Sequence, residues 1–272
     1  MSAQSDWNLL TSVAENYERN LVPIIFAPWA TDLVEIAVLQ PGDRVLDVAC
    51  GTGIVARVAA RKLGDAGSVT GLDASAPMIT AARAAATAEG LAVEWREASA
   101  VELPFPEAAF DILLCQSGLQ FFPNRPTSLR EMHRVLKPGG RLILSVWGPI
   151  ERSPGFAVAA DALTRHIGPE AARPITSGAF GLSDAEELRA LITDAKFKDV
   201  TVHVAVKTLR YPSPDEFVLR HLAGSPLGRA VGDAGENALA ALLAEVGARL
   251  ASAVDGRGLA FPIEANIAVA RT

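Results

Sequence analysis

Short runs of aliphatic residues alternate with helical patterns between residues 41 and 147, and this alternation limits the possible folds more than any other feature of the chain. The runs cover residues 44–49, 68–73, 93–98, 110–116 and 141–147. They are rich in Val, Leu and Ile with little polar alternation, as expected for parallel strands that are covered on both faces. Strands separated by helices form βαβ units, so the sequence predicts an α/β fold around a parallel sheet.

The chain after residue 147 predicts one more helix and two more strands. Ser183 and Glu186 match a capping box at the start of a helix over residues 183–196. Residues 199–209 alternate valine with polar side chains, which is typical of a strand at the edge of a sheet. Residues 263–271 are again apolar and predict a last strand.

Three segments lack this alternation and carry helical patches, namely residues 1–40, 150–178 and 212–258. We expect them to form a helical cap over the carboxyl edge of the sheet, where ligands bind in open α/β folds. No clear linker separates them from the rest of the chain. The prediction is therefore one domain over residues 1–272, with a ligand-binding core at residues 41–147.

A glycine-rich turn follows the first predicted strand. Gly51, Gly53 and Ala56 form a G-x-G-x-x-A pattern that opens a helix, and Asp73 ends the next strand. Glycines let the backbone approach a ligand closely, and an acidic residue at this spacing can bind ribose hydroxyls. This pattern fits a nicotinamide dinucleotide as well as S-adenosylmethionine (SAM).

Asp47 distinguishes between a nicotinamide dinucleotide and SAM as the predicted ligand. It lies inside the first strand, four residues before Gly51. A dinucleotide would place its pyrophosphate over the turn, where a carboxylate repels it. SAM has no phosphate there and carries a cationic amino group and a sulfonium. Asp47 therefore favours SAM.

Four segments in order resemble the motifs of class I SAM-dependent methyltransferases. They are VLDVACGTG at residues 45–53, GLDASAPMI at residues 71–79, and the segments 103–122 and 135–147. The last two are similar to the group that includes the ubiquinone and menaquinone biosynthesis methyltransferases. The resemblance implies a Rossmann-like seven-stranded sheet of order 3-2-1-4-5-7-6, with strand 7 antiparallel.

The resemblance also implies roles in cofactor binding. The loop with Ala49, Gly51 and Gly53, and Asp47 before it, would hold the methionine part of SAM, and Asp73 would bind the ribose. The other implied contacts are Ala74, Met78, Ser99 and Ala100 around the adenine, Gln116 near the methyl group, and Tyr17 on an N-terminal helix that covers the cofactor. Relatives commonly carry Asp where Ser99 stands, and serine can accept a hydrogen bond without a charge.

The residues expected at the acceptor are Tyr17, Gln120, Phe121 and Trp147. Gln120 stands where many relatives carry His. Methyl transfer from a sulfonium depends largely on alignment and a dry site. A phenol or amine acceptor needs a base to remove a proton, whereas a carboxylate or thiolate does not. The sequence gives no compelling base. Among the four histidines, His221 is kept as a candidate because it follows Phe217 and Val218 on a short helical pattern in the expected cap, and packing is the alternative. No metal site is expected.

The amino-acid composition limits the classes of partner and the cellular compartment that we expect. The net charge of −6 argues against nucleic acid, because binding to phosphates needs clustered Lys and Arg. Cys50 and Cys115 lie in apolar segments without metal-ligand spacing, which suits a reducing compartment. Residues 1–10 lack a secretory pattern and no apolar stretch is long enough to span a bilayer. We expect a cytoplasmic monomer or homodimer.

The leading hypothesis is an enzyme that moves the SAM methyl group to a small, mostly apolar metabolite and releases S-adenosylhomocysteine. An oxygen acceptor is favoured, and nitrogen or carbon is possible. Two alternatives stay open at this point: an NAD-dependent oxidoreductase, and a SAM-binding regulator without catalysis.

Overall fold

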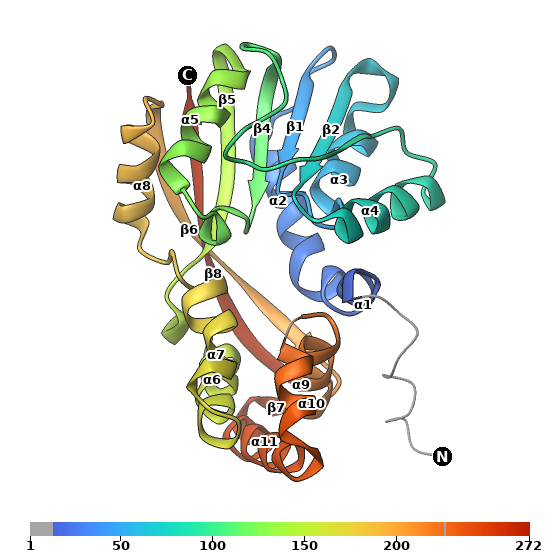
Figure 1. Cartoon of the computed structure of the whole chain (residues 1–272), viewed down its shortest axis with the longest axis vertical. Coiled ribbons are helices and arrows are strands. Elements are labelled where there is room, and N and C mark those ends of the chain that lie inside the picture. The colour runs from blue at the N-terminus through green and yellow to red at the C-terminus, as the bar shows by residue number, and fades with distance from the viewer. Residues whose placement is uncertain (1–12, 226) are drawn as a thin grey trace.

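The computed structural model describes residues 13–225 and 227–272, so residues 1–12 of the predicted cap and the N-terminal segment compared with a secretory signal lie outside the described residues. The sheet has eight strands in the order β3-β2-β1-β4-β5-β8-β6, with the short β7 paired to β8 (Figure 1). The strands are β1 Arg44–Val48, β2 Ser68–Asp73, β3 Glu94–Glu97, β4 Phe110–Gln116, β5 Leu136–Trp147, β6 Lys198–Tyr211, β7 Val254–Asp255 and β8 Gly258–Arg271.

The predicted strand order is confirmed. The pairings among β1 to β5 are parallel, and β8 runs antiparallel between β5 and β6. β8 thus takes the place of the expected seventh strand, and β7 is an additional two-residue strand.

Both faces of the sheet are covered, which explains the missing polar alternation in its strands. Val45 and Ile112 point to one face, where α2 (Ala27–Ala37), α3 (Ile54–Leu63) and α4 (Ala76–Ala88) contribute to the core. Leu46 and Leu113 point to the other face, against α5 (Arg125–Val135) and α8 (Ala185–Asp194). Successive side chains of a buried strand need apolar partners on opposite sides.

A second group of helices is attached to the sheet by a long antiparallel arm. β6 and β8 stay paired from Thr201 and Val269 to Tyr211 and Leu259, although β5 ends at Trp147. The arm leads to the helical lobe seen below the sheet in Figure 1. The lobe contains α6 Pro154–His166, α7 Pro169–Arg173, α9 Pro214–Ala223, α10 Leu227–Ala234 and α11 Glu236–Arg249.

Shorter helical segments complete the described chain. They are α1 Val13–Asn20, η2 Val22–Phe26, η3 Gly64–Ala66, η4 Leu119–Phe121, η5 Ile150–Arg152, η6 Pro174–Ala179 and η7 Ala251–Ala253. Among residues 13–225 and 227–272, no single helix could cross a membrane by length and composition. Only the bent pair Val13–Asn20 and Val22–Ala37 meets that criterion jointly.

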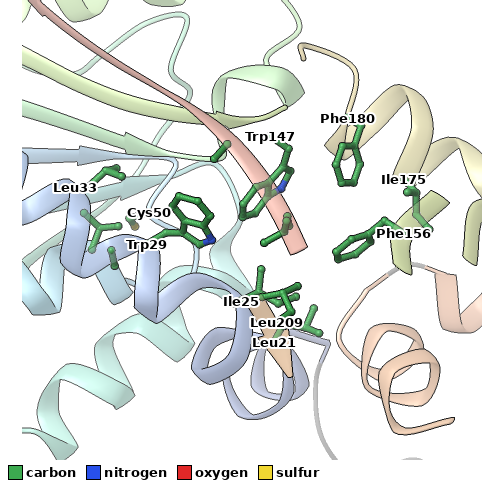
Figure 2. Packing of buried hydrophobic residues seen from close by; sticks show 14 of the residues in the cluster. Leu21, Ile25, Trp29, Leu33, Cys50, Trp147, Phe156, Ile175, Phe180 and Leu209 are labelled. Carbon is green, nitrogen blue, oxygen red and sulfur yellow. The ribbon is translucent and has the colours of Figure 1, made fainter. Parts of the chain in front are cut away.

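Aromatic side chains fill the junction between the sheet and the helical lobe. Trp147 at the end of β5 packs edge-on against Trp29 of α2, with 5.9 Å between ring centroids. Figure 2 shows Trp147 together with Phe156 and Phe180 of the lobe, all members of one buried cluster. Phe156 and Phe180 have ring centroids 5.5 Å apart. The core and the lobe therefore share a continuous apolar interior.

Two local predictions were wrong. The helix predicted at residue 183 begins at Ala185, and its cap is Asp184, whose carboxylate accepts hydrogen bonds from the backbone N–H groups of Glu186 and Glu187. Asp and Ser are both good N-caps, so adjacent candidates cannot be told apart by type. The fifth strand begins at Leu136 rather than residue 141.

Candidate functional site

A cavity of about 380 Å³ opens at the carboxyl ends of β1, β2 and β4. This is the edge where open α/β sheets bind ligands. Its wall includes ten of the residues predicted to bind the cofactor: Tyr17, Asp47, Ala49, Gly51, Asp73, Ala74, Met78, Ser99, Ala100 and Gln116. Segments that are far apart in the sequence thus converge on one site.

The glycine turn has the backbone that its sequence suggests, but its two glycines serve different needs. Ala49, Gly51 and Gly53 all have positive φ, of 57°, 54° and 82°. Gly51 lines the cavity, and its N–H donates to Oδ2 of Asp73 at 2.8 Å. Gly53 does not line the cavity. A Cβ added there would lie 2.3 Å from the Trp95 ring, so packing beneath the loop requires this glycine.

Asp47 presents an unpartnered carboxylate oxygen inside the protein. The side chain is fully buried, and its Oδ2 accepts a hydrogen bond from the N–H of Ala56 at 3.0 Å. Its Oδ1 has no partner. Burial, assisted by the charge of Asp73, raises the pKa of Asp47 to about 8 against the opposing effect of the Ala56 bond. A cationic group placed against Oδ1 would reverse this shift.

Asp73 connects the loop to the next helix. Its Oδ1 accepts from the N–H of Ser75 at 2.9 Å, while Oδ2 accepts from Gly51. Ser75 is the N-cap of α4, but its own side chain makes no capping hydrogen bond. Asp73 therefore fixes two backbone segments and still has lone pairs toward the cavity, since each carboxylate oxygen has two.

The wall beyond Asp73 is small and weakly polar. Ala74, Met78, Ser99 and Ala100 all line the cavity. The hydroxyl of Ser99 accepts a long hydrogen bond of 3.4 Å from the N–H of Val101. The Ser99 side chain thus supplies a polar group without a charge at this end of the cavity.

The opposite end of the cavity carries orphaned polar atoms. Gln116 donates from Nε2 to the carbonyl oxygen of Phe26 at 2.9 Å, which leaves its Oε1 buried and without a partner. The hydroxyl of the neighbouring Ser117 is likewise unpartnered. Tyr17 and Phe26 form an aromatic wall here, with 5.0 Å between ring centroids.

The residues predicted at the acceptor are only partly brought together. Tyr17 and Phe121 line the cavity, and Phe121 is 58% exposed. Gln120 and Trp147 are buried and outside the cavity wall. The side-chain amide of Gln120 has no partner, and Trp147 packs against Phe26 at 6.1 Å between ring centroids.

His221 lies in the helical lobe and outside the cavity wall. Its Nδ1 donates to the carbonyl oxygen of Phe217 at 2.7 Å, and its Nε2 has no partner. Burial lowers the pKa of His221 to about 4, so the ring is neutral near pH 7. It borders a separate apolar cavity of about 20 Å³ together with Phe156 and Phe217.

Sequence reasoning missed an ion-pair network beside the site. Arg57 on α3 is only 3% exposed and pairs with Glu18 of α1 and Glu89 beyond α4. Glu18 also accepts a hydrogen bond from the hydroxyl of Thr52 in the glycine turn. The available signal was a lone arginine on the apolar face of an alanine-rich helix. No group of His, Cys, Asp and Glu within the described ranges could hold a metal ion.

Comparison with known proteins agrees with this geometry. The family model described as a methyltransferase domain matches residues 46–144. A ubiquinone/menaquinone biosynthesis C-methyltransferase, UbiE, of Ectopseudomonas mendocina is 34% identical over 64% of this chain and 73% of that protein. The 2-phytyl-1,4-naphtoquinone methyltransferase of Synechococcus elongatus is 41% identical over 42% of this chain. The chain spans about half the length of that relative, 49%.

Solved structures share the fold. The YcgJ protein of Bacillus subtilis aligns over 90% of this chain and 98% of its own, with a TM-score of 0.61 and 18% identity. Phosphoethanolamine N-methyltransferase 2 of Haemonchus contortus, solved with SAM, aligns over 95% of this chain and 56% of its own, with a TM-score of 0.60 and 19% identity. Together with the similarity to UbiE, the strand order and the glycine turn, these matches show that the chain belongs to the class I SAM-dependent methyltransferases.

Proposed function

We propose that this chain transfers the methyl group of SAM to a small, mostly apolar metabolite. The observation that carries the proposal is the pair of carboxylates, Asp47 and Asp73, at the wall of one cavity beside the glycine turn. Two acidic groups at this edge oppose a pyrophosphate and favour a cation. The NAD-dependent oxidoreductase is therefore not favoured.

The residues present fit the cofactor. The unpartnered Oδ1 of Asp47 offers the charge that an amino group needs, and Asp73 offers acceptors for ribose hydroxyls. Ala74, Met78 and Ala100 would border the adenine, with the Ser99 hydroxyl at its edge. When bound, SAM supplies an electrophilic methyl group; the protein orients it and excludes water.

The residues at the Gln116 end of the cavity support a methyl acceptor that carries a hydroxyl group on an otherwise apolar molecule. Because Nε2 of Gln116 is held by the Phe26 carbonyl, Oε1 is left as a hydrogen-bond acceptor that calls for a donor. Phe26 and Phe121 provide apolar surface around it. An O–H acceptor fits best, and an N–H or an activated carbon next to a hydroxyl would also suit Gln116. Quinol-like compounds have this form, and the names of the relatives include quinone methyltransferases, of which UbiE is named a C-methyltransferase.

A labelled-methyl assay tests the proposal. The protein is incubated with SAM carrying a labelled methyl group and a panel of acceptors: a naphthohydroquinone, a simple phenol, an aliphatic amine and a carboxylic acid. We expect transfer to the hydroquinone or phenol, with product mass spectrometry identifying the methylated atom. Tight SAM binding without transfer to any acceptor in the panel or in a metabolite extract would instead support a non-catalytic SAM-binding regulator.

We also propose that the partner is a small molecule rather than nucleic acid, and that the protein works in the cytoplasm as a monomer or homodimer. The net charge of −6 disfavours binding to a phosphate backbone. Cys50 and Cys115 are free and buried, as is usual in a reducing compartment. Size-exclusion chromatography with light scattering would distinguish the two oligomeric states.

A further inference from the structure

One buried arginine connects three helices around the cofactor cavity. The guanidinium of Arg57 on α3 lies 2.6 Å from Oε1 of Glu18 on α1, and a second nitrogen bonds Glu89 at the end of α4. The other oxygen of Glu18 accepts from Thr52 Oγ1 at 2.5 Å. Glu18 therefore holds both the arginine and the glycine turn, whereas Glu89 holds the arginine and Arg61.

The helix that carries Glu18 also forms part of the cavity wall. Tyr17, the preceding residue, lines the cavity and packs against Phe26. A Cβ added to Gly51 would lie 3.9 Å from the Tyr17 ring, so the ring lies directly over the glycine turn. Displacing α1 would remove this part of the wall.

Helix α1 depends on tertiary contacts for its position. It has eight residues, and isolated helices of that length are not stable in water. Its buried end packs where Gly224 of the lobe approaches Leu21 and the backbone of Tyr17. The hydrogen bonds of Glu18 are charge-assisted and reach the rigid core, so they are suited to fix the helix.

We propose that Glu18 is a positioning residue that latches α1 over the bound cofactor. Its carboxylate holds Thr52 of the glycine turn and keeps Tyr17 in the cavity wall. Release of SAM or its product then requires the Glu18 contacts to break first. The consequence for cofactor exchange rests on the proposed function, but the position of α1 does not.

The matched test compares Glu18 with Glu89, because both pair with Arg57 and only Glu18 belongs to α1. Either variant leaves Arg57 with one carboxylate, so neither leaves the buried cation alone. The variants Glu18→Ala and Glu18→Gln, with Glu89→Ala and Glu89→Gln as controls, are made in the full chain. Thermal unfolding of all four shows whether the fold is retained.

The first readout is hydrogen exchange of the α1 amides without any ligand. We expect exchange over residues 13–20 to be about tenfold faster in Glu18→Ala, an intermediate increase in Glu18→Gln, and no change in the Glu89 variants. The second is dissociation of pre-bound labelled SAM after addition of excess unlabelled SAM. Here we expect about a tenfold faster rate in Glu18→Ala, an intermediate increase in Glu18→Gln, and no change in the Glu89 variants.

Equal exchange in the Glu18 and Glu89 variants would overturn the latch. So would faster α1 exchange without faster SAM release. If the wild-type protein binds no SAM, the proposed function fails, while the exchange experiment still decides whether Glu18 fixes α1. If Glu18→Ala does not fold, Glu18→Gln allows the same comparison. Its amide has a similar shape but only one acceptor oxygen and no charge, so it cannot accept hydrogen bonds from both Arg57 and Thr52 through separate oxygens.

Discussion

The binding of SAM should release a proton from Asp47. In the empty protein, burial raises the pKa of this carboxyl to about 8, so it is mostly neutral at pH 7. A cation against its unpartnered Oδ1 favours the carboxylate and lowers the pKa of the complex. Well below pH 8, each further unit by which the pH falls should therefore weaken SAM binding nearly tenfold, or about 1.4 kcal/mol. Between pH 8 and pH 6 the Kd should rise roughly fiftyfold.

Isothermal titration calorimetry measures this directly. At pH 7, titrations in buffers of different ionisation enthalpy should show release of about 0.9 proton per SAM bound. Asp47→Asn is the control, because it keeps the shape of the side chain and cannot titrate. Any proton release that it retains belongs to SAM or to other groups and is subtracted. Identical pH dependence in both proteins would refute the reasoning.

The same shift predicts how stability depends on pH. The folded-state pKa of Asp47 lies above its unfolded value of 3.8, so the folded protein binds more protons between the two values. This group therefore lowers the free energy of unfolding as pH rises from about 4 to 8. Asp47→Asn should raise Tm at pH 8 and change it little at pH 4. Equal effects at both pH values would contradict this assignment.

Two further predictions concern positions that hold the fold. Gly53→Ala combines a clash with the indole beneath it and a φ of +82°, and should lower the free energy of unfolding by about 2–4 kcal/mol in urea titrations. Gly42→Ala, at φ +92° with open space around it, should cost only about 1 kcal/mol, and equal losses would rule out the clash as the cause. Asp184→Ala should lower the free energy of unfolding by about 1 kcal/mol because it removes the N-cap of α8, whereas Ser183→Ala should be nearly neutral. A larger loss of Tm in Ser183→Ala than in Asp184→Ala would instead support Ser183 as the cap.

Much of the fold could be predicted because its signals are local. Strands covered on both faces are uniformly apolar, and the glycine turn between strand and helix fixes the edge at which ligands bind. Asp47 and Asp73 follow from spacing within two adjacent strands. Choosing Ser183 over its neighbour as a cap failed because both residue types satisfy the same backbone donors.

The remaining features depend on contacts that no local pattern contains. Glu18 and Arg57 meet across 39 residues, and nothing in either segment indicates the other. The need for glycine at position 53 is set by the side chain of Trp95, more than 40 residues away. The G-x-G-x-x-A pattern predicts a ligand site and does not indicate this packing requirement. Gln120 follows β4 and Trp147 is the last residue of β5, yet strand position does not specify whether a side chain reaches the cavity.

Trp95 has a consequence for how this sequence can change over time. Its indole occupies the space that a Cβ would need at Gly53 and also at Gly71, where the distance would be 2.4 Å. Either glycine can become alanine only if the ring is first replaced by something smaller, and a smaller residue would leave a void under the turn. The three positions should therefore vary together among descendants of this protein. A lineage that loses the tryptophan removes the clash with the indole at both glycines at once, while the φ of +82° still favours glycine at position 53.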